Sequence, residues 1–150
     1  MTGMHCYAIT DPSGTLRIVL PMPTPSLNEW NGRRWYAKAK IKRTWWDAIA
    51  LLLGMRVVST ATTKRSVTIE RHAPRMLDHD NAWAGVKPIL DALVTLGLLV
   101  DDAPKWCDLH VSQHKTGRGE PPHTVIVIED ALSLGEASGF APGATRGDKA

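Results

Sequence analysis

The chain has 150 residues, of which 43% are hydrophobic, and its 18 basic and 15 acidic residues give a net charge of +3. This composition is typical of one globular domain and excludes a fibrous or wholly disordered chain. No segment has the roughly 20 consecutive apolar residues that a membrane span needs, and residues 1–14 lack the apolar run of a signal peptide. The two cysteines, Cys6 and Cys107, are too few for a disulfide framework. We therefore expect a cytoplasmic protein without a membrane partner, and the excess of basic residues favours a polyanionic one.

The first half of the chain predicts a strand, a stiff loop, a long helix and a second strand. Residues 18–20 form a short apolar run that stops at residues 21–25, where three prolines disfavour helix and central strand. From Ala37 onward, apolar residues recur at three- and four-residue steps, and Gly54 can end the helix. Residues 67–72 alternate apolar and polar side chains over a β-branched stretch, which predicts a strand.

The second half predicts one more helix and two more strands. Residues 86–94 carry apolar side chains at helical spacing, and Gly97 can end that helix. Residues 109–114 and 124–128 favour strands, and the turn-rich connector 116–122 favours a hairpin between them. The expected order is thus strand, helix, strand, helix, strand, strand.

This order predicts an α+β fold in which two main helices pack on a small mixed β-sheet. We expect one domain over residues 1–130. Residues 131–150 contain four glycines and five alanines with one aromatic residue, too little apolar mass to offset the entropy of ordering. We therefore expect a flexible C-terminal tail over residues 131–150.

The most informative segment is the acidic motif Asp78-His79-Asp80-Asn81. In an extended backbone, Asp78 and Asp80 project to the same side of the chain. Two carboxylates that close repel each other unless a cation lies between them, and hard oxygen ligands favour Mg²⁺ or Mn²⁺. The motif therefore indicates a divalent metal site, while two solvated surface acids are the alternative interpretation.

A lysine follows this motif at helical spacing. Lys87 and Asp91 are four residues apart and Asp80 lies seven before Lys87, so one continuous helix would place all three on one face. A lysine beside a metal site can stabilise the charge that builds on a phosphate under attack. The alternative is a surface ion pair between Lys87 and Asp91. An EF-hand loop is excluded because Ala82 and Trp83 stand where it needs an oxygen ligand and a glycine.

Together these motifs resemble the RusA-like Holliday junction resolvases, small homodimeric Mg²⁺-dependent endonucleases of phages and prophages. The resemblance covers about residues 16–130. The matching pieces, in the family's order, are Leu20-Pro21-x-Pro23, Pro25-Ser26-Leu27-Asn28, Asp78-x-Asp80-Asn81, Lys87-x-x-x-Asp91-Ala92-Leu93, Gly97 and Asp101-Asp102-Ala103.

The resemblance implies a RusA-like fold and a role for each matching position. Asp78, Asp80 and Asp102 resemble the metal-binding carboxylates, with Asp101 as a further metal ligand. Lys87 resembles the family's catalytic lysine. Asn81 and Asp91 correspond to residues that contact the metal ligands and the lysine rather than the metal itself. The implied cofactor is Mg²⁺, for which Mn²⁺ can substitute, and the implied location is the cytoplasm of a bacterial or phage-infected cell.

The chain departs from the family pattern at three places. The spacing from Asp80 to Lys87 is seven residues where the family usually has four, and three extra residues turn a helix by about 300°. Pro88 disfavours helical geometry at Lys87, so we expect the regular helix to begin at Pro88. Leu77 stands where the bacterial resolvase has an arginine, and Arg75 is the candidate to replace that phosphate contact.

A basic segment precedes the acidic motif. Between Trp30 and Trp46 lie no acidic residues and six basic ones: Arg33, Arg34, Lys38, Lys40, Lys42 and Arg43. The aromatic residues of this segment can stack on bases exposed at a DNA branch point. We expect DNA contacts from Arg33, Arg34, Lys38 and Lys40. The alternative is that Trp45 lies in the core and Lys38, Lys42 and Arg43 form the solvated side of its helix.

Three histidines, His72, His110 and His114, fall on predicted strands. A zinc site is disfavoured, because no cysteine or carboxylate spacing completes a tetrahedral set of ligands around them.

The expected function is a Mg²⁺-dependent, structure-specific endodeoxyribonuclease that resolves four-way DNA junctions by paired symmetric nicks, in DNA recombination and repair. Two symmetric cuts need two equivalent sites, so a homodimer is expected to bind branched double-stranded DNA. A non-catalytic branched-DNA-binding protein on the same scaffold is the main alternative. Another phosphoryl-transfer enzyme is a third, although no nucleotide-binding motif supports it.

Overall fold

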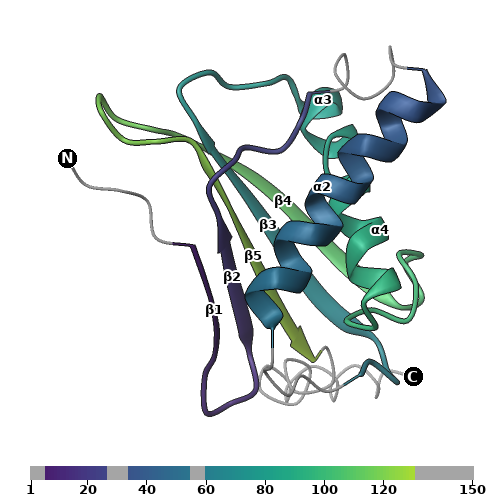
Figure 1. The fold of residues 1–150 in the computed structure, drawn as a ribbon. Helices are drawn as coiled ribbons and strands as arrows, with labels where there is room; N and C mark the ends of the chain where they lie inside the picture. The colour runs from purple at the N-terminus through teal and green to yellow at the C-terminus, as the bar shows by residue number, and fades with distance from the viewer. Residues whose placement is uncertain (1–5, 27–33, 55–59, 131–150) are drawn as a thin grey trace, which may run out of the picture.

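The computed structural model describes residues 6–26, 34–54 and 60–130, which form one sheet with helices on one of its faces (Figure 1). In chain order the elements are β1 (Tyr7–Thr10), β2 (Leu16–Leu20), α2 (Trp35–Leu53), β3 (Arg65–Ala73), α3 (His79–Ala84), α4 (Lys87–Thr95), β4 (Cys107–Lys115) and β5 (His123–Asp130). The predicted α+β fold, with two main helices on a small mixed sheet, is confirmed. The sequence patterns missed β1 and α3. The predicted tail lies outside the described residues, and no described helix is long and apolar enough to cross a membrane.

The strands lie in the order β1-β2-β5-β3-β4, in which β3 and β4 are parallel and the other neighbours antiparallel. The predicted hairpin is therefore wrong, because β3 lies between β4 and β5. The connector 116–122 is long enough to cross the roughly 10 Å between the two strands that flank β3. β3 lies between β5 and β4, and its side chains Val67 and Ile69 are fully buried in the core.

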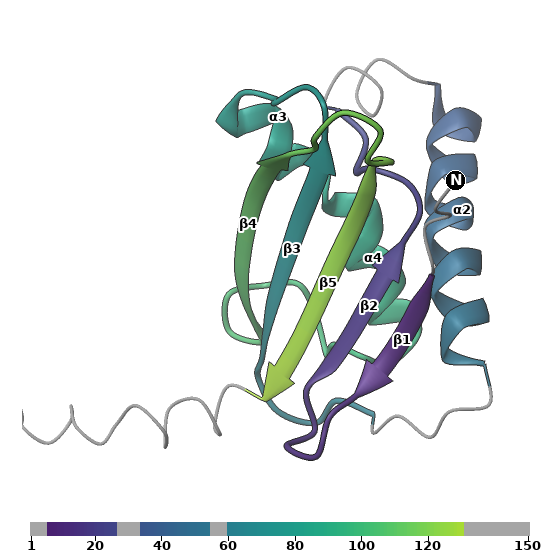
Figure 2. The same ribbon diagram turned by 90° about the vertical axis from the view of Figure 1, so that its left-hand side faces the viewer.

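The core fills the space between the sheet and the helices α2 and α4 (Figure 2). Trp45 and Ile49 of α2, and Ile89 and Leu93 of α4, are buried in it. Trp45 is thus a core residue, as its helical spacing predicted. The opposite face of the sheet, which carries the alternate side chains of β3 such as His72, faces the viewer in Figure 2 with no described helix across it.

Both predicted helix ends are confirmed. α2 stops at Gly54, and α4 is followed by Gly97, whose φ of 82° favours glycine. α4 begins at Lys87, one residue before the predicted start, with Pro88 in the first turn where its missing N–H breaks no helical bond.

Candidate functional site

The acidic motif does not lie in an extended segment as predicted. Asp78 is the N-cap of the short helix α3: its Oδ1 accepts a hydrogen bond from the backbone N–H of Asn81 at 2.9 Å. Its Oδ2 accepts another from Asn81 Nδ2, also at 2.9 Å. The cap satisfies an N–H group that has no partner within the helix, which favours helix over strand here. Asp80 lies in the first turn of α3, where residues rotate by about 100° each, so it does not share a side with Asp78 as in a strand.

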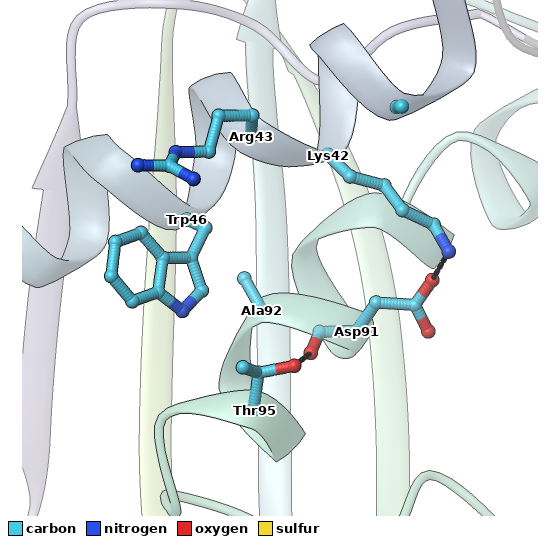
Figure 3. A pocket seen from close by; sticks show the side chains of 7 residues that line it. Lys42, Arg43, Trp46, Asp91, Ala92 and Thr95 are labelled. Carbon is cyan, nitrogen blue, oxygen red and sulfur yellow. Dashed lines mark hydrogen bonds and ion pairs between the residues drawn. The ribbon is translucent and has the colours of Figure 1, made fainter. Parts of the chain in front are cut away.

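Lys87 contacts two carboxylates. Asp91 lies one helical turn after it in α4, and Asp102 lies fifteen residues after Lys87 in the chain. Its Nζ lies 2.5 Å from Asp102 Oδ2 and 3.1 Å from Asp91 Oδ1. On the other side of Asp91, Lys42 Nζ of α2 lies 2.9 Å from Oδ2 (Figure 3). The structure therefore brings together three positions that the resemblance singles out, and it adds Lys42. We name these four residues the Lys87 network.

The charges of the Lys87 network stabilise one another. The hydrogen bond to Asp102 raises the pKa of Lys87 above its usual value, and the same bond lowers the pKa of the Asp102 carboxyl. Lys87 is thus protonated and Asp102 ionised at neutral pH. Two cations alternate with two anions, so the network is close to neutral as a whole.

The predicted metal ligands match Mg²⁺ in their chemistry, because all are carboxylates. Asp78, Asp80 and Asp101 are exposed, and Asp102 is half-buried. Among the residues that the structure describes, these side chains do not form a group of three ligand atoms within 4.8 Å of one another. Asp78 accepts hydrogen bonds from Asn81, and Asp102 accepts one from Lys87, while each carboxylate keeps further lone pairs that a metal ion could use.

A pocket of about 480 Å³ lies between α2 and α4, next to the Lys87 network (Figure 3). It is lined by Ala39, Lys42, Arg43, Trp46, Asp91, Ala92 and Thr95. The Arg43 guanidinium lies 5.2 Å from the centre of the Trp46 ring and pairs with Asp47 at 2.9 Å. The basic helix α2 thus forms one wall of a pocket whose other wall, α4, carries Lys87 network residues.

The predicted DNA-contacting residues lie mostly on exposed surface. Arg34 is the N-cap of α2 and is exposed, as is Lys40, whereas Lys38 is half-buried. Arg75 is exposed in the segment that leads from β3 to Asp78. Arg33 lies outside the described residues.

Two aromatic side chains at the start of α2 are unusually exposed. Trp35 is 79% exposed and Tyr36 is 56% exposed, and their rings meet edge to face with centroids 6.0 Å apart. Large aromatic surfaces beside basic residues are typical of sites that stack on nucleic-acid bases.

A second cluster lies on the open face of the sheet. His72 of β3 stacks between His114 of β4 and His123 of β5, with centroid distances of 4.6 and 4.2 Å. Carboxylates join them in two overlapping groups, one of Glu70, His72 and His114 and the other of His72, Glu120 and His123, each with ligand atoms within 4.8 Å. His110 belongs to neither group.

The sequence argument against metal binding by histidines does not hold in the folded chain, because Glu70 and Glu120 supply the carboxylates. Alternation within β3 already placed Glu70 and His72 on one face. The contribution of His123 and Glu120 depends on the pairing of β5 with β3, which the predicted hairpin had wrong.

No known family model matches this chain, and no curated protein matches it at a significant level. The assignment of a function therefore depends on the residues and contacts of the chain itself.

Proposed function

We propose that the chain is a Mg²⁺-dependent endodeoxyribonuclease of the RusA-like type, which cuts four-way DNA junctions by paired symmetric nicks. The observation that carries the proposal is the contact of Lys87 with Asp102, fifteen residues apart, and with Asp91. These three positions match the resolvase motifs in the sequence, and the fold brings them to one place.

The electrostatics of α2 support a DNA substrate. Lys42 links this basic helix to Asp91, so the positively charged surface and the acidic residues are adjacent. Phosphate groups are attracted by such a surface, whereas the exposed Trp35 and Tyr36 offer stacking partners for bases at a branch. The basic surface and the exposed aromatic rings together fit a DNA substrate that presents both its phosphate backbone and unpaired or unstacked bases.

Each residue of the site has a chemical role in this proposal. Asp78, Asp80 and Asp102 would hold the Mg²⁺ ion, which would supply an activated water and neutralise charge on the phosphate. Lys87 keeps its proton at Nζ and donates a hydrogen bond to a phosphate oxygen when it exchanges Asp102 for substrate.

Two further residues position these groups. Asp91 holds Lys87 through its Oδ1. Asn81 donates to Asp78 and so orients that carboxylate.

A homodimer belongs to the same proposal. A four-way junction has approximate two-fold symmetry, so two symmetric nicks need two equivalent sites related by a two-fold axis.

A non-catalytic branched-DNA-binding protein is the second candidate, and a specific observation favours it. Asp102 is already neutralised by Lys87, and Asp78 already caps α3. If these contacts persist on DNA, the acids serve stability, and the basic and aromatic residues of α2 provide binding alone.

Cleavage of a labelled four-way junction, beside a linear duplex of matched sequence, tests the proposal with Mg²⁺ and with EDTA. Asp78→Asn and Asp102→Asn are the test variants. Asparagine is as good an N-cap as aspartate, so Asp78→Asn retains α3. Asp108→Asn is the control, because it makes the same charge change on β4, where Asp108 is exposed and 3.9 Å from Lys64.

We expect symmetric nicks in the junction from the wild type and Asp108→Asn, only with metal. Both test variants should lose at least about 100-fold in rate while they still bind the junction. Cleavage that survives in both variants contradicts the site. Junction binding without cleavage by the wild type in Mg²⁺ and Mn²⁺ supports the second candidate instead.

A further inference from the structure

The histidine cluster on the open face of the sheet is fixed by the strand register. His72 pairs with His123 across β3 and β5, and with His114 across β3 and β4. Paired residues of neighbouring strands point to the same face, so the backbone holds the three imidazoles side by side. The ring planes of His123 and His114 lie 10° and 16° from that of His72.

Hydrogen bonds leave one nitrogen of the His72 ring and one nitrogen of the His123 ring available as metal ligands. His123 Nδ1 lies 3.0 Å from the carbonyl oxygen of Pro121. A carbonyl only accepts, so Nδ1 donates and the lone pair of a neutral ring lies on Nε2. His72 Nε2 lies 3.1 Å from Glu70 Oε1, so it donates to that carboxylate and leaves the lone pair on Nδ1. Metal-bound histidines usually donate their other N–H to a carbonyl or carboxylate in this way.

Glu120 supplies an anionic ligand beside the two rings. It lies in the connector between β4 and β5, and its Oε1 accepts a hydrogen bond from the Gly117 N–H at 3.0 Å. One ligand atom each from His72, Glu120 and His123 lie within 4.8 Å of one another. Tetrahedral zinc, with bonds of about 2.0–2.1 Å, holds its ligand atoms about 3.3 Å apart, so the two stacked rings and the carboxylate must rotate toward one another to bind an ion.

We propose that His72, His123 and Glu120 bind one divalent transition-metal ion, Zn²⁺ being the expected species. Two imidazoles and a carboxylate suit Zn²⁺ and its neighbours in the first transition row, whereas Mg²⁺ prefers oxygen ligands alone. Glu70 positions His72, and the remaining coordination position is open to water. The bound ion ties the β4–β5 connector to the ends of β3 and β5.

The overlapping group of Glu70, His72 and His114 is a poorer site. In it the carboxylate and the nearest His72 nitrogen are already bonded to each other at 3.1 Å.

This proposal does not depend on the nuclease proposal. Its ligands lie outside the acidic motif and the Lys87 network, and the metal differs in kind. If the Asp102→Asn variant binds Zn²⁺ as tightly as the wild type does, the two sites are independent of each other.

Titration of untagged, EDTA-treated and then desalted protein with Zn²⁺ by calorimetry tests the site, and Co²⁺ reports its geometry through visible absorption. Glu120→Gln and His123→Ala are the test variants. His110→Ala is the matched control, because His110 is exposed on the same face of β4 and belongs to neither group. Far-UV circular dichroism in EDTA verifies that each variant is folded.

We expect one equivalent of metal to bind the wild type and His110→Ala with the same affinity. Glu120→Gln and His123→Ala should each weaken binding at least about tenfold. Because Glu120 is exposed and glutamine can still accept from Gly117, Glu120→Gln decides the matter even if His123→Ala does not fold. Absence of binding, or equal affinity of wild type and Glu120→Gln, overturns the proposal.

Discussion

The junction between α3 and α4 requires a glycine, because a side chain at this position has no room. Gly85 caps α3 with a φ of −69°, an ordinary helical value that any residue adopts. A Cβ at this position, however, would lie 1.8 Å from the carbonyl oxygen of Pro25 and 3.0 Å from its carbon. The proline-rich segment after β2 and the α3–α4 junction are therefore in direct backbone contact, and Gly85→Ala is a test of that contact.

The size of the effect follows from the distance. Real Cβ contacts are essentially never below 3.0 Å, so in Gly85→Ala the Cβ and the Pro25 oxygen must separate by at least 1.2 Å. Both groups are fixed to buried backbone, so no side chain can rotate to make room. Overpacking of this kind costs about 1–3 kcal/mol and occasionally more, and we expect a loss of about 3 kcal/mol in the free energy of unfolding.

Urea unfolding at fixed m-value measures this loss. Gly117→Ala is the control, because the nearest atom to a Cβ at position 117 lies 4.0 Å away. This substitution should leave the free energy of unfolding within about 0.5 kcal/mol of wild type. A Gly85→Ala protein as stable as Gly117→Ala refutes the reasoning, because Pro25 and Gly85 then do not lie against each other. Since Lys87 follows Gly85 by two residues, the same variant should also lower any cleavage rate.

Two further predictions concern titratable groups. Lys87→Met should lower the free energy of unfolding at pH 7 by at most about 1 kcal/mol, because both partners are partly exposed and screened by solvent. The pKa of Asp102 is lowered in the folded protein, so its ion pair with Lys87 stabilises the fold above pH 3.8, and this stabilisation is lost as the pH falls through the pKa of the folded state. The difference in the free energy of unfolding between wild type and Lys87→Met should therefore shrink in acid. Burial raises the pKa of the Cys107 thiol to about 11, so at pH 8 a thiol reagent should modify it much more slowly than the exposed Cys6.

Urea titrations at pH 7 and pH 3 measure the first effect, and a difference between wild type and Lys87→Met that grows in acid contradicts it. Reaction of both thiols in urea is the control for the second. Two equally fast thiols in the folded protein contradict the burial of Cys107.

Local patterns were sufficient for much of the fold. The three- and four-residue spacing around Trp45 predicted α2, and alternation predicted β3, because a single apolar face has the period of the element that carries it. The four-residue spacing of Lys87 and Asp91 predicted their ion pair, found at 3.1 Å. The cap formed by Asp78 and Asn81 is also local, and the preference of aspartate for N-caps was the signal that could have revealed it.

The rest depended on pairing between distant segments. β3 separates β4 from β5, and this order places His123 and Glu120 beside His72. The contact of Lys87 with Asp102 likewise requires the chain to return after α4. Periodicity fixes which face of a strand is buried, but many strand orders bury the same faces. The choice among them is made by the packing of the whole core, and with it the composition of both candidate sites.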